Sequence, residues 1–156
     1  MRIALASDHA GALLKLELVE YVASLGHDAL NLGGDPAHST DYPEAAFAVA
    51  EGVVNGAYER GILVCGTGIG MSIAANKVQG VRAALCHEGY SARMCRDHND
   101  ANVLCLGQRV IGIGLAKDIV QVFLETSFSH GENHKRRMGQ VRDYESGAGP
   151  VAERGQ

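Results

Sequence analysis

The stretch "GILVCGTGIGMSIAANK" (residues 61–77) contains the features that decide the fold. An apolar run ends at Cys65, three glycines follow at alternate positions, and a helix-like pattern begins near Met71. This order of buried strand, tight turn and helix is typical of a strand in a parallel sheet. The rest of the chain repeats the same alternation of short apolar and amphipathic segments.

The alternation predicts five strands and six helices. The strands are expected at 2–7, 29–32, 61–65, 81–86 and 102–107, and the helices at 10–26, 43–54, from 71, 88–97, 113–126 and 133–145. Gly26 is expected to end the first helix, and Pro43 to begin the second, because proline suits the first helical turn. Polar residues directly after the strands, such as Asp8, His9, Cys65 and Arg109, would then gather at the edge of the sheet where ligands bind.

Composition and charge argue against several classes of function. The 156 residues suit one domain, and 46% hydrophobic with 21% charged residues is typical of a globular chain. The net charge of −4 argues against nucleic-acid and anionic-membrane partners. No apolar segment approaches the ~20 residues of a membrane helix, and the N-terminus meets Asp8 too early for a secretory signal. Four cysteines without a CxxC pair are expected to be reduced thiols, which predicts a cytoplasmic protein.

The turn after Cys65 is close to three phosphate-handling motifs and matches none of them. Met71 stands where a dinucleotide fingerprint needs its third glycine and where a cysteine phosphatase needs an arginine, and the P-loop lysine is also absent. The shared physics remains, because the amides of a glycine-rich turn and a helix N-terminus attract an anion. They also stabilise a thiolate, which can act as nucleophile or base. The alternative is a buried strand cysteine beside glycines that only permit a tight turn.

Three other segments each have a functional and a structural interpretation. Asp8-His9 is a site element or a helix cap with an incidental histidine. "RDHNDAN" (96–102) is a site element or a polar turn, which Asn and Asp favour. "HKRRMGQVR" (134–142) is an anion site or, more commonly, a solvated helix face. No HExxH motif and no closed His/Cys spacing predicts a metal site.

Together these segments resemble the ribose-5-phosphate isomerase type B family, which includes galactose-6-phosphate and allose-6-phosphate isomerases. The resemblance rests on "ASDHAG" (6–11), "TDYP" (40–43), "CGTGIGMSIAANK" (65–77), "RDHNDANVLCLGQRV" (96–110) and the basic segment ending at Arg137. It implies isomerisation of a sugar phosphate without cofactor or metal, through an enediolate. D-ribose 5-phosphate and D-ribulose 5-phosphate are the expected pair.

The resemblance also implies a role for each site residue. Cys65 matches the base that moves a proton between C1 and C2, and Thr67 with the turn backbone matches the anion hole. His98, with Asp8, matches the acid–base pair that opens the sugar ring. The expected substrate contacts are Asp8, His9, Gly66, Thr67, Gly68, Ile69, Gly70, Asn99, Arg109, Asn133 and Arg137.

One position departs from the family pattern. Many members have an arginine four residues before the one matching Arg137, on the same helix face, whereas this chain has Asn133. Asparagine can donate a hydrogen bond but has no charge, and charge-assisted bonds are roughly twice as strong. A four- or six-carbon sugar phosphate, or an unphosphorylated sugar, therefore stays open as the substrate.

The resemblance implies a homodimer or homotetramer with composite sites, in which His98, Asn99 and Arg109 face the Cys65 loop of a partner. Two other classes stay open: a non-catalytic sugar-phosphate-binding paralogue, and a cysteine phosphatase or redox enzyme, which Met71 and the lack of CxxC disfavour.

The predicted fold class is α/β, a three-layer Rossmann-like fold with a five-stranded parallel sheet flanked by helices, plus a C-terminal helix. It forms one domain over 1–145, followed by a tail at 146–156 that is expected to be disordered.

Overall fold

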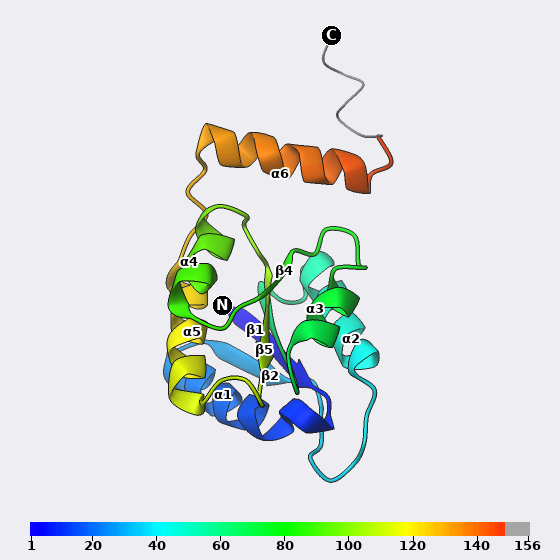
Figure 1. Ribbon diagram of the computed structural model, residues 1–156, viewed down its shortest axis with the longest axis vertical. Coiled ribbons are helices and arrows are strands. Elements are labelled where there is room, and N and C mark those ends of the chain that lie inside the picture. The colour runs from blue at the N-terminus through cyan, green and yellow to red at the C-terminus, as the bar shows by residue number, and fades with distance from the viewer. Residues whose placement is uncertain (149–156) are drawn as a thin grey trace.

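The computed structural model describes residues 1–148 (Figure 1). Its elements are, in order, β1 (Arg2–Ser7), η1 (His9–Gly11), α1 (Ala12–Ser24), β2 (Asp28–Asn31), α2 (Tyr42–Val54), β3 (Arg60–Cys65), α3 (Ile69–Ala75), β4 (Ala83–Leu85), α4 (Gly89–Asp97), β5 (Val103–Gly107), α5 (Ile113–Glu125) and α6 (Glu132–Glu145). All predicted strands and helices are present, with small shifts at their ends. The first predicted helix begins with a short 3-10 turn, η1. The expected disordered tail lies, from residue 149 on, outside the described residues.

The five strands form one parallel sheet in the order β2-β1-β3-β5-β4. Helices α1, α4 and α5 cover one face, and α2 and α3 cover the other (Figure 1). Two apolar clusters, one on each face, make up the core. The predicted three-layer α/β fold is therefore confirmed.

Strand alternation determines where the Cys65 side chain lies. In β3, Ile62 and Val64 pack against the α1–α5 side, while Leu63 and Cys65 belong to the cluster under α2 and α3. Successive side chains of a strand point to opposite faces, so Val64, the neighbour of Cys65 in β3, faces away from it. The thiol therefore sits on the α2–α3 face at the last residue of β3.

The chain order changes at the β1–β3 pair. From β1 the chain moves outward to β2 and then returns to place β3 on the other side of β1. Ser7 lies opposite Val64, so the residues that follow, Asp8 and Cys65, lie side by side at this end of the sheet. Ligands of open parallel sheets bind at such a switch point.

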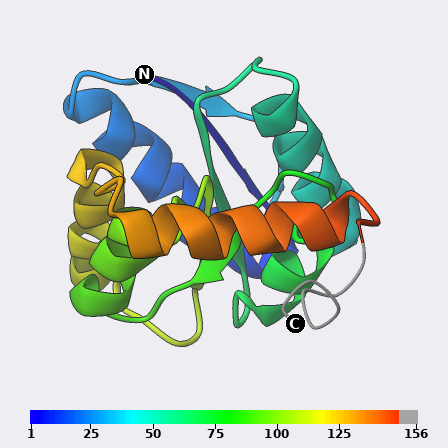
Figure 2. The same cartoon turned by 90° about the horizontal axis from the view of Figure 1, so that it is seen from above.

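Helix α6 stands apart from the layered body. It lies across the top of the molecule in Figure 1, and in Figure 2, seen from above, it crosses in front of the layers. None of its residues is buried. In the described chain its contacts with the body are made by partly covered side chains such as His134 and Met138.

Gly107, at the end of β5, provides a test of the packing around the β3–α3 turn. A Cβ at Gly107 would lie 2.7 Å from the Thr67 carbonyl carbon and oxygen. We expect Gly107→Ala to lower the free energy of unfolding by about 1–3 kcal/mol, because backbone must move to relieve the clash. Urea denaturation measures the change in the free energy of unfolding.

Gly114→Ala, in α5, is the matched control, because a Cβ there meets nothing within 4 Å. It should leave stability unchanged or raise it by up to ~1 kcal/mol. Equal stabilities for the two variants would contradict the close packing of β5 on the turn.

Candidate active site

A cleft of about 340 Å³ opens at the carboxyl ends of β1 and β3. It is lined by Asp8, His9, Ala10, Tyr42, Cys65, Gly66, Thr67, Gly70 and Arg109. Seven of these nine were predicted as site residues, and they come from three loops that follow β1, β3 and β5. The expectation that strand-end residues gather at one edge is confirmed for this group.

The Cys65 sulfur is held by the turn that follows it. The thiol is 5% exposed, and the Gly68 N–H donates a hydrogen bond to its Sγ at 3.1 Å. The turn therefore fixes the position of the sulfur at the end of β3 through a direct contact.

Three residues of the turn, Thr67, Gly68 and Ile69, differ in whether they line the cleft. The Thr67 Oγ1 lies 3.4 Å from the Ile69 amide, which donates to it. Gly68 and Ile69, both predicted as substrate contacts, lie outside the residues that line the cleft. The Gly68 amide faces the sulfur, and the Ile69 side chain is 52% exposed on the first turn of α3.

Asp8 both caps η1 and lines the cleft. Its buried carboxylate accepts a hydrogen bond from the Gly11 N–H at 3.0 Å, as an N-cap residue does. The next residue, His9, is exposed, and its Nδ1 lies 3.4 Å from the carbonyl oxygen of Thr40. Asp8 is therefore a helix cap that also lines the cleft.

Arg109 lies against the turn of its own chain. Its amide donates to the Gly66 carbonyl at 3.0 Å, and the Gln108 amide donates to the Cys65 carbonyl at 2.9 Å. The Arg109 side chain packs beside Gly66. We expected Arg109 to face the Cys65 loop of a partner. That expectation was wrong for this chain, because the two backbone hydrogen bonds hold the residue beside its own Cys65 loop.

The remaining predicted residues form a second group. His98 and Asn99 follow α4, and Asn133 and Arg137 are on α6; none of the four lines the Cys65 cleft. Helix α6 and the η1 region near the cleft lie toward opposite ends of the molecule (Figure 1). Within one chain, the predicted site residues therefore form two separate groups: the cleft group, and the α4–α6 group of His98, Asn99, Asn133 and Arg137.

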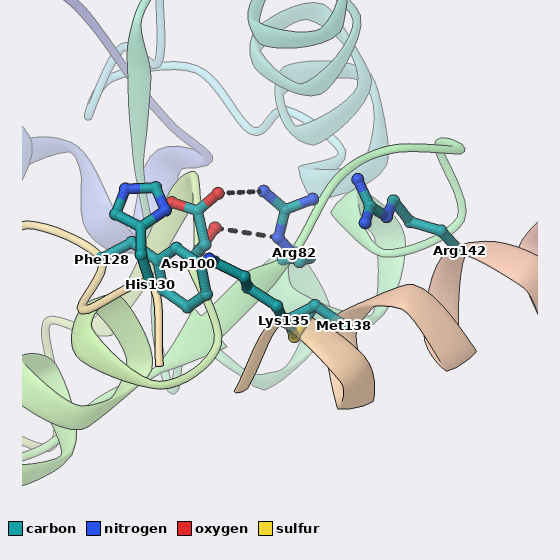
Figure 3. Close-up of a pocket in the computed structure, with 7 residues that line it drawn as sticks. All are labelled: Arg82, Asp100, Phe128, His130, Lys135, Met138 and Arg142. Carbon is teal, nitrogen blue, oxygen red and sulfur yellow. Dashed lines mark hydrogen bonds and ion pairs between the residues drawn. The ribbon is translucent and has the colours of Figure 1, made fainter. Parts of the chain in front are cut away.

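The loop that carries His98 and Asn99 is fixed by a charged network. Asp100 accepts from the Arg96 Nη1 at 2.9 Å and from the Arg82 Nη2 at 3.0 Å, and its φ of 47° lies in the left-handed region. Arg96 is 6% exposed and also donates to the Ala101 carbonyl. The Arg82–Asp100 contact borders a cavity of about 300 Å³ beneath α6, which includes no predicted site residue (Figure 3).

Sequence reasoning missed Tyr42 as a cleft residue. "TDYP" contributed to the resemblance, but nothing in its letters shows that α2 begins at Tyr42 and turns the ring toward the β3–α3 turn. A Cβ at Gly70 would lie 3.0 Å from that ring. Pro43 gives only a partial signal, because it predicts that a helix begins at this point but not that the Tyr42 ring lies over the cleft.

Two structural features are absent from residues 1–148. In that range no three His, Cys, Asp or Glu side chains are gathered as metal ligands. No helix there is both long and apolar enough to cross a membrane.

The Asp100 network yields a stability prediction. Asp100→Asn should lower the free energy of unfolding by about 1–3 kcal/mol, because it leaves the buried Arg96 guanidinium without its carboxylate. Thermal or urea unfolding measures the change. The exposed Asp118 of α5 is the control, and Asp118→Asn should be neutral; similar losses in both variants would contradict the structural role of the network.

Known proteins resemble this chain along most of its length. The profile of the family described as Ribose/Galactose Isomerase matches residues 3–141. Ribose-5-phosphate isomerase B of Escherichia coli (strain K12) is 45% identical over 135 residues, which are 86% of this chain and 91% of that protein. D-erythrulose-4-phosphate isomerase of Pectobacterium atrosepticum is 43% identical over 132 residues, which are 84% and 87% of the two chains.

A solved structure agrees with these relatives. Ribose-5-phosphate isomerase B of Clostridium thermocellum superposes with a TM-score of 0.92 at 46% identity and covers 96% of this chain and 100% of its own. The resemblance drawn from the motifs is thus confirmed by the family profile, by the relatives and by the fold. The chain belongs to the Ribose/Galactose Isomerase family.

Proposed function

We propose that this sugar phosphate isomerase interconverts D-ribose 5-phosphate and D-ribulose 5-phosphate without a cofactor, with Cys65 as the base. The observation that carries the proposal is the position of the thiol. Cys65 ends β3 in the cleft, the Gly68 amide donates to its sulfur, and the Thr67 hydroxyl is two residues away in the same cleft. Proton abstraction next to a carbonyl needs such a base beside donors for the developing oxyanion.

The proton transfer can be written through this geometry. The Cys65 thiolate takes the proton from C2 of the open-chain aldose, a C1–C2 double bond forms, and the negative charge develops on O1. The thiol then returns the proton to C1, while the O2 hydroxyl proton moves to O1 and leaves a ketone at C2. The Thr67 hydroxyl and turn amides that do not bond the sulfur stabilise the enediolate, at roughly 3–4 kcal/mol per donor.

We further propose that the functional unit is a homodimer with composite sites. Ring opening by His98 and phosphate binding by Arg137 require these side chains near Cys65, but neither lines the cleft of its own chain. Helix α6 has no buried residue and exposes Val141 and Tyr144, which a second copy could cover. In this proposal the α4–α6 group of one subunit completes the partner's cleft. Pairing of two dimers stays a prediction.

The phosphate would be bound from both subunits. His9 and Arg109 line the cleft, and Arg137 with Asn133 would approach from the partner's α6. The uncharged Asn133 favours a second candidate function, isomerisation of a four-carbon sugar phosphate. A relative with 43% identity is named D-erythrulose-4-phosphate isomerase. Location in the cytoplasm and the absence of a cofactor also remain predictions.

Substitution of Cys65 tests the proposal directly. Cys65→Ala should lower kcat for formation of ribulose 5-phosphate from ribose 5-phosphate at least ~10³-fold, because it removes the base. A coupled or colorimetric ketose assay without added metal measures the rate. Cys86→Ala, at a buried thiol that does not line the cleft, is the control and should stay within about threefold of the wild type.

Two other outcomes would change the proposal. Turnover by Cys65→Ala at a tenth of the wild-type rate or more, roughly within 1.4 kcal/mol of the original barrier, would remove the thiol from the mechanism. Conversion of erythrose 4-phosphate but not ribose 5-phosphate by the wild type would establish the four-carbon function instead.

A further inference from the structure

The His134 ring packs on the His98 ring. His134 is on the first turn of α6, and His98 directly follows α4. Their ring centroids are 4.2 Å apart with an interplanar angle of 44°. His134 was not among the predicted site residues, so its contact with the proposed ring-opening residue had no assigned role.

A chain of hydrogen bonds fixes the orientation of His134. Its Nδ1 lies 2.9 Å from the Ser129 Oγ, and the Ser129 Oγ lies 2.8 Å from the Asp97 carbonyl oxygen. A carbonyl can only accept, so the single Ser129 hydroxyl proton is donated to Asp97. Ser129 must then accept from His134, which therefore carries a proton on Nδ1.

The same series of hydrogen bonds reaches the peptide that precedes His98. The Ser129 amide also donates to the Asp97 carbonyl, at 3.1 Å. Asp97 directly precedes His98, and its Oδ2 is 3.5 Å from the His98 Nε2. The 126–131 segment and the start of α6 thus hold both the peptide before His98 and one face of its ring.

His98 needs such support, because its side chain is 43% exposed. An exposed side chain samples several rotamers, and fixing one of them costs conformational entropy. An acid–base group must stay within hydrogen-bond reach of its target, so a fixed ring can transfer a proton more often.

We propose that His134 is a positioning residue that holds the His98 imidazole in the orientation from which it opens the sugar ring. The proposal rests on the proposed function, in which His98 performs ring opening. His134 itself acts through His98. The alternative is that His134 only anchors the start of α6.

Two assays on the full-length protein separate these roles. Conversion of ribose 5-phosphate needs ring opening, because the aldose is mainly cyclic. Exchange of one C1 hydrogen of ribulose 5-phosphate with D₂O, followed by NMR, starts from an open-chain ketose and needs Cys65 but not ring opening. A positioning residue for His98 affects the first assay far more than the second.

His134→Asn keeps an N–H donor for Ser129 but removes the ring that contacts His98. We expect it to lower kcat for ribose 5-phosphate at least tenfold, about 1.4 kcal/mol in the barrier, while KM and C1 exchange change less than about threefold. His134→Phe restores a ring but not the hydrogen bond to Ser129, and it should recover part of the lost kcat. Ser129→Ala, which loosens the His134 ring without altering it, should give an intermediate kcat and normal exchange.

Lys135→Asn, the next residue on α6, is the matched control and should behave like the wild type in both assays. Equal losses of conversion and exchange in His134→Asn, or no loss of either, would overturn the proposal; so would a His134→Phe variant as slow as His134→Asn. If the wild type itself catalyses neither reaction, the proposed function is wrong and the role of His134 falls with it. Wild-type activity that depends on Cys65, with a neutral His134→Asn, would overturn only the role of His134.

Discussion

The left-handed turn at Gly68 is the constraint on which the cleft depends. Its φ of 79° lies in the left-handed region at the start of α3, and its amide donates to the Cys65 sulfur. A Cβ there would lie 2.9 Å from the Leu106 carbonyl carbon, so the turn also requires glycine for its packing on β5. Because Gln108 and Arg109 donate to the Cys65 and Gly66 carbonyls, the β5 end and the turn are fixed together.

The two groups of the site differ in how they are supported. The cleft group stands on the central strands β1, β3 and β5, whose side chains are nearly all buried. The α4–α6 group depends on the Arg82–Asp100–Arg96 network and on the contact between His98 and His134. In the proposed mechanism, enolisation uses the rigid sheet end, and ring opening and part of the phosphate binding use a more exposed element supplied by the partner.

Much of the fold and of the cleft group was predictable, because the sequence patterns that indicate them are local. The change from strand-like to helix-like periodicity, with glycine and proline at the ends, predicted the elements, and strand ends predicted Asp8, His9, Cys65 and Arg109 as neighbours. Contacts between distant segments were not predictable. Lys15, for example, lies buried in α1, where its Nζ donates to the Asn31 side chain at 2.7 Å and burial lowers its pKa. The cleft position of Tyr42, the own-chain contact of Arg109 and the stacking of His134 likewise depend on tertiary packing.

In the proposed dimer, one active site uses Cys65 of one subunit and His98 of its partner. Mixing inactive Cys65→Ala and His98→Asn proteins, with brief denaturation and refolding to exchange subunits, tests it. Composite sites predict recovery of about a quarter of wild-type activity, because half of the randomly formed dimers are mixed and each mixed dimer has one site with both residues intact. No recovery, in a mixture shown to contain mixed dimers, would contradict the composite site and return both residues to the same chain.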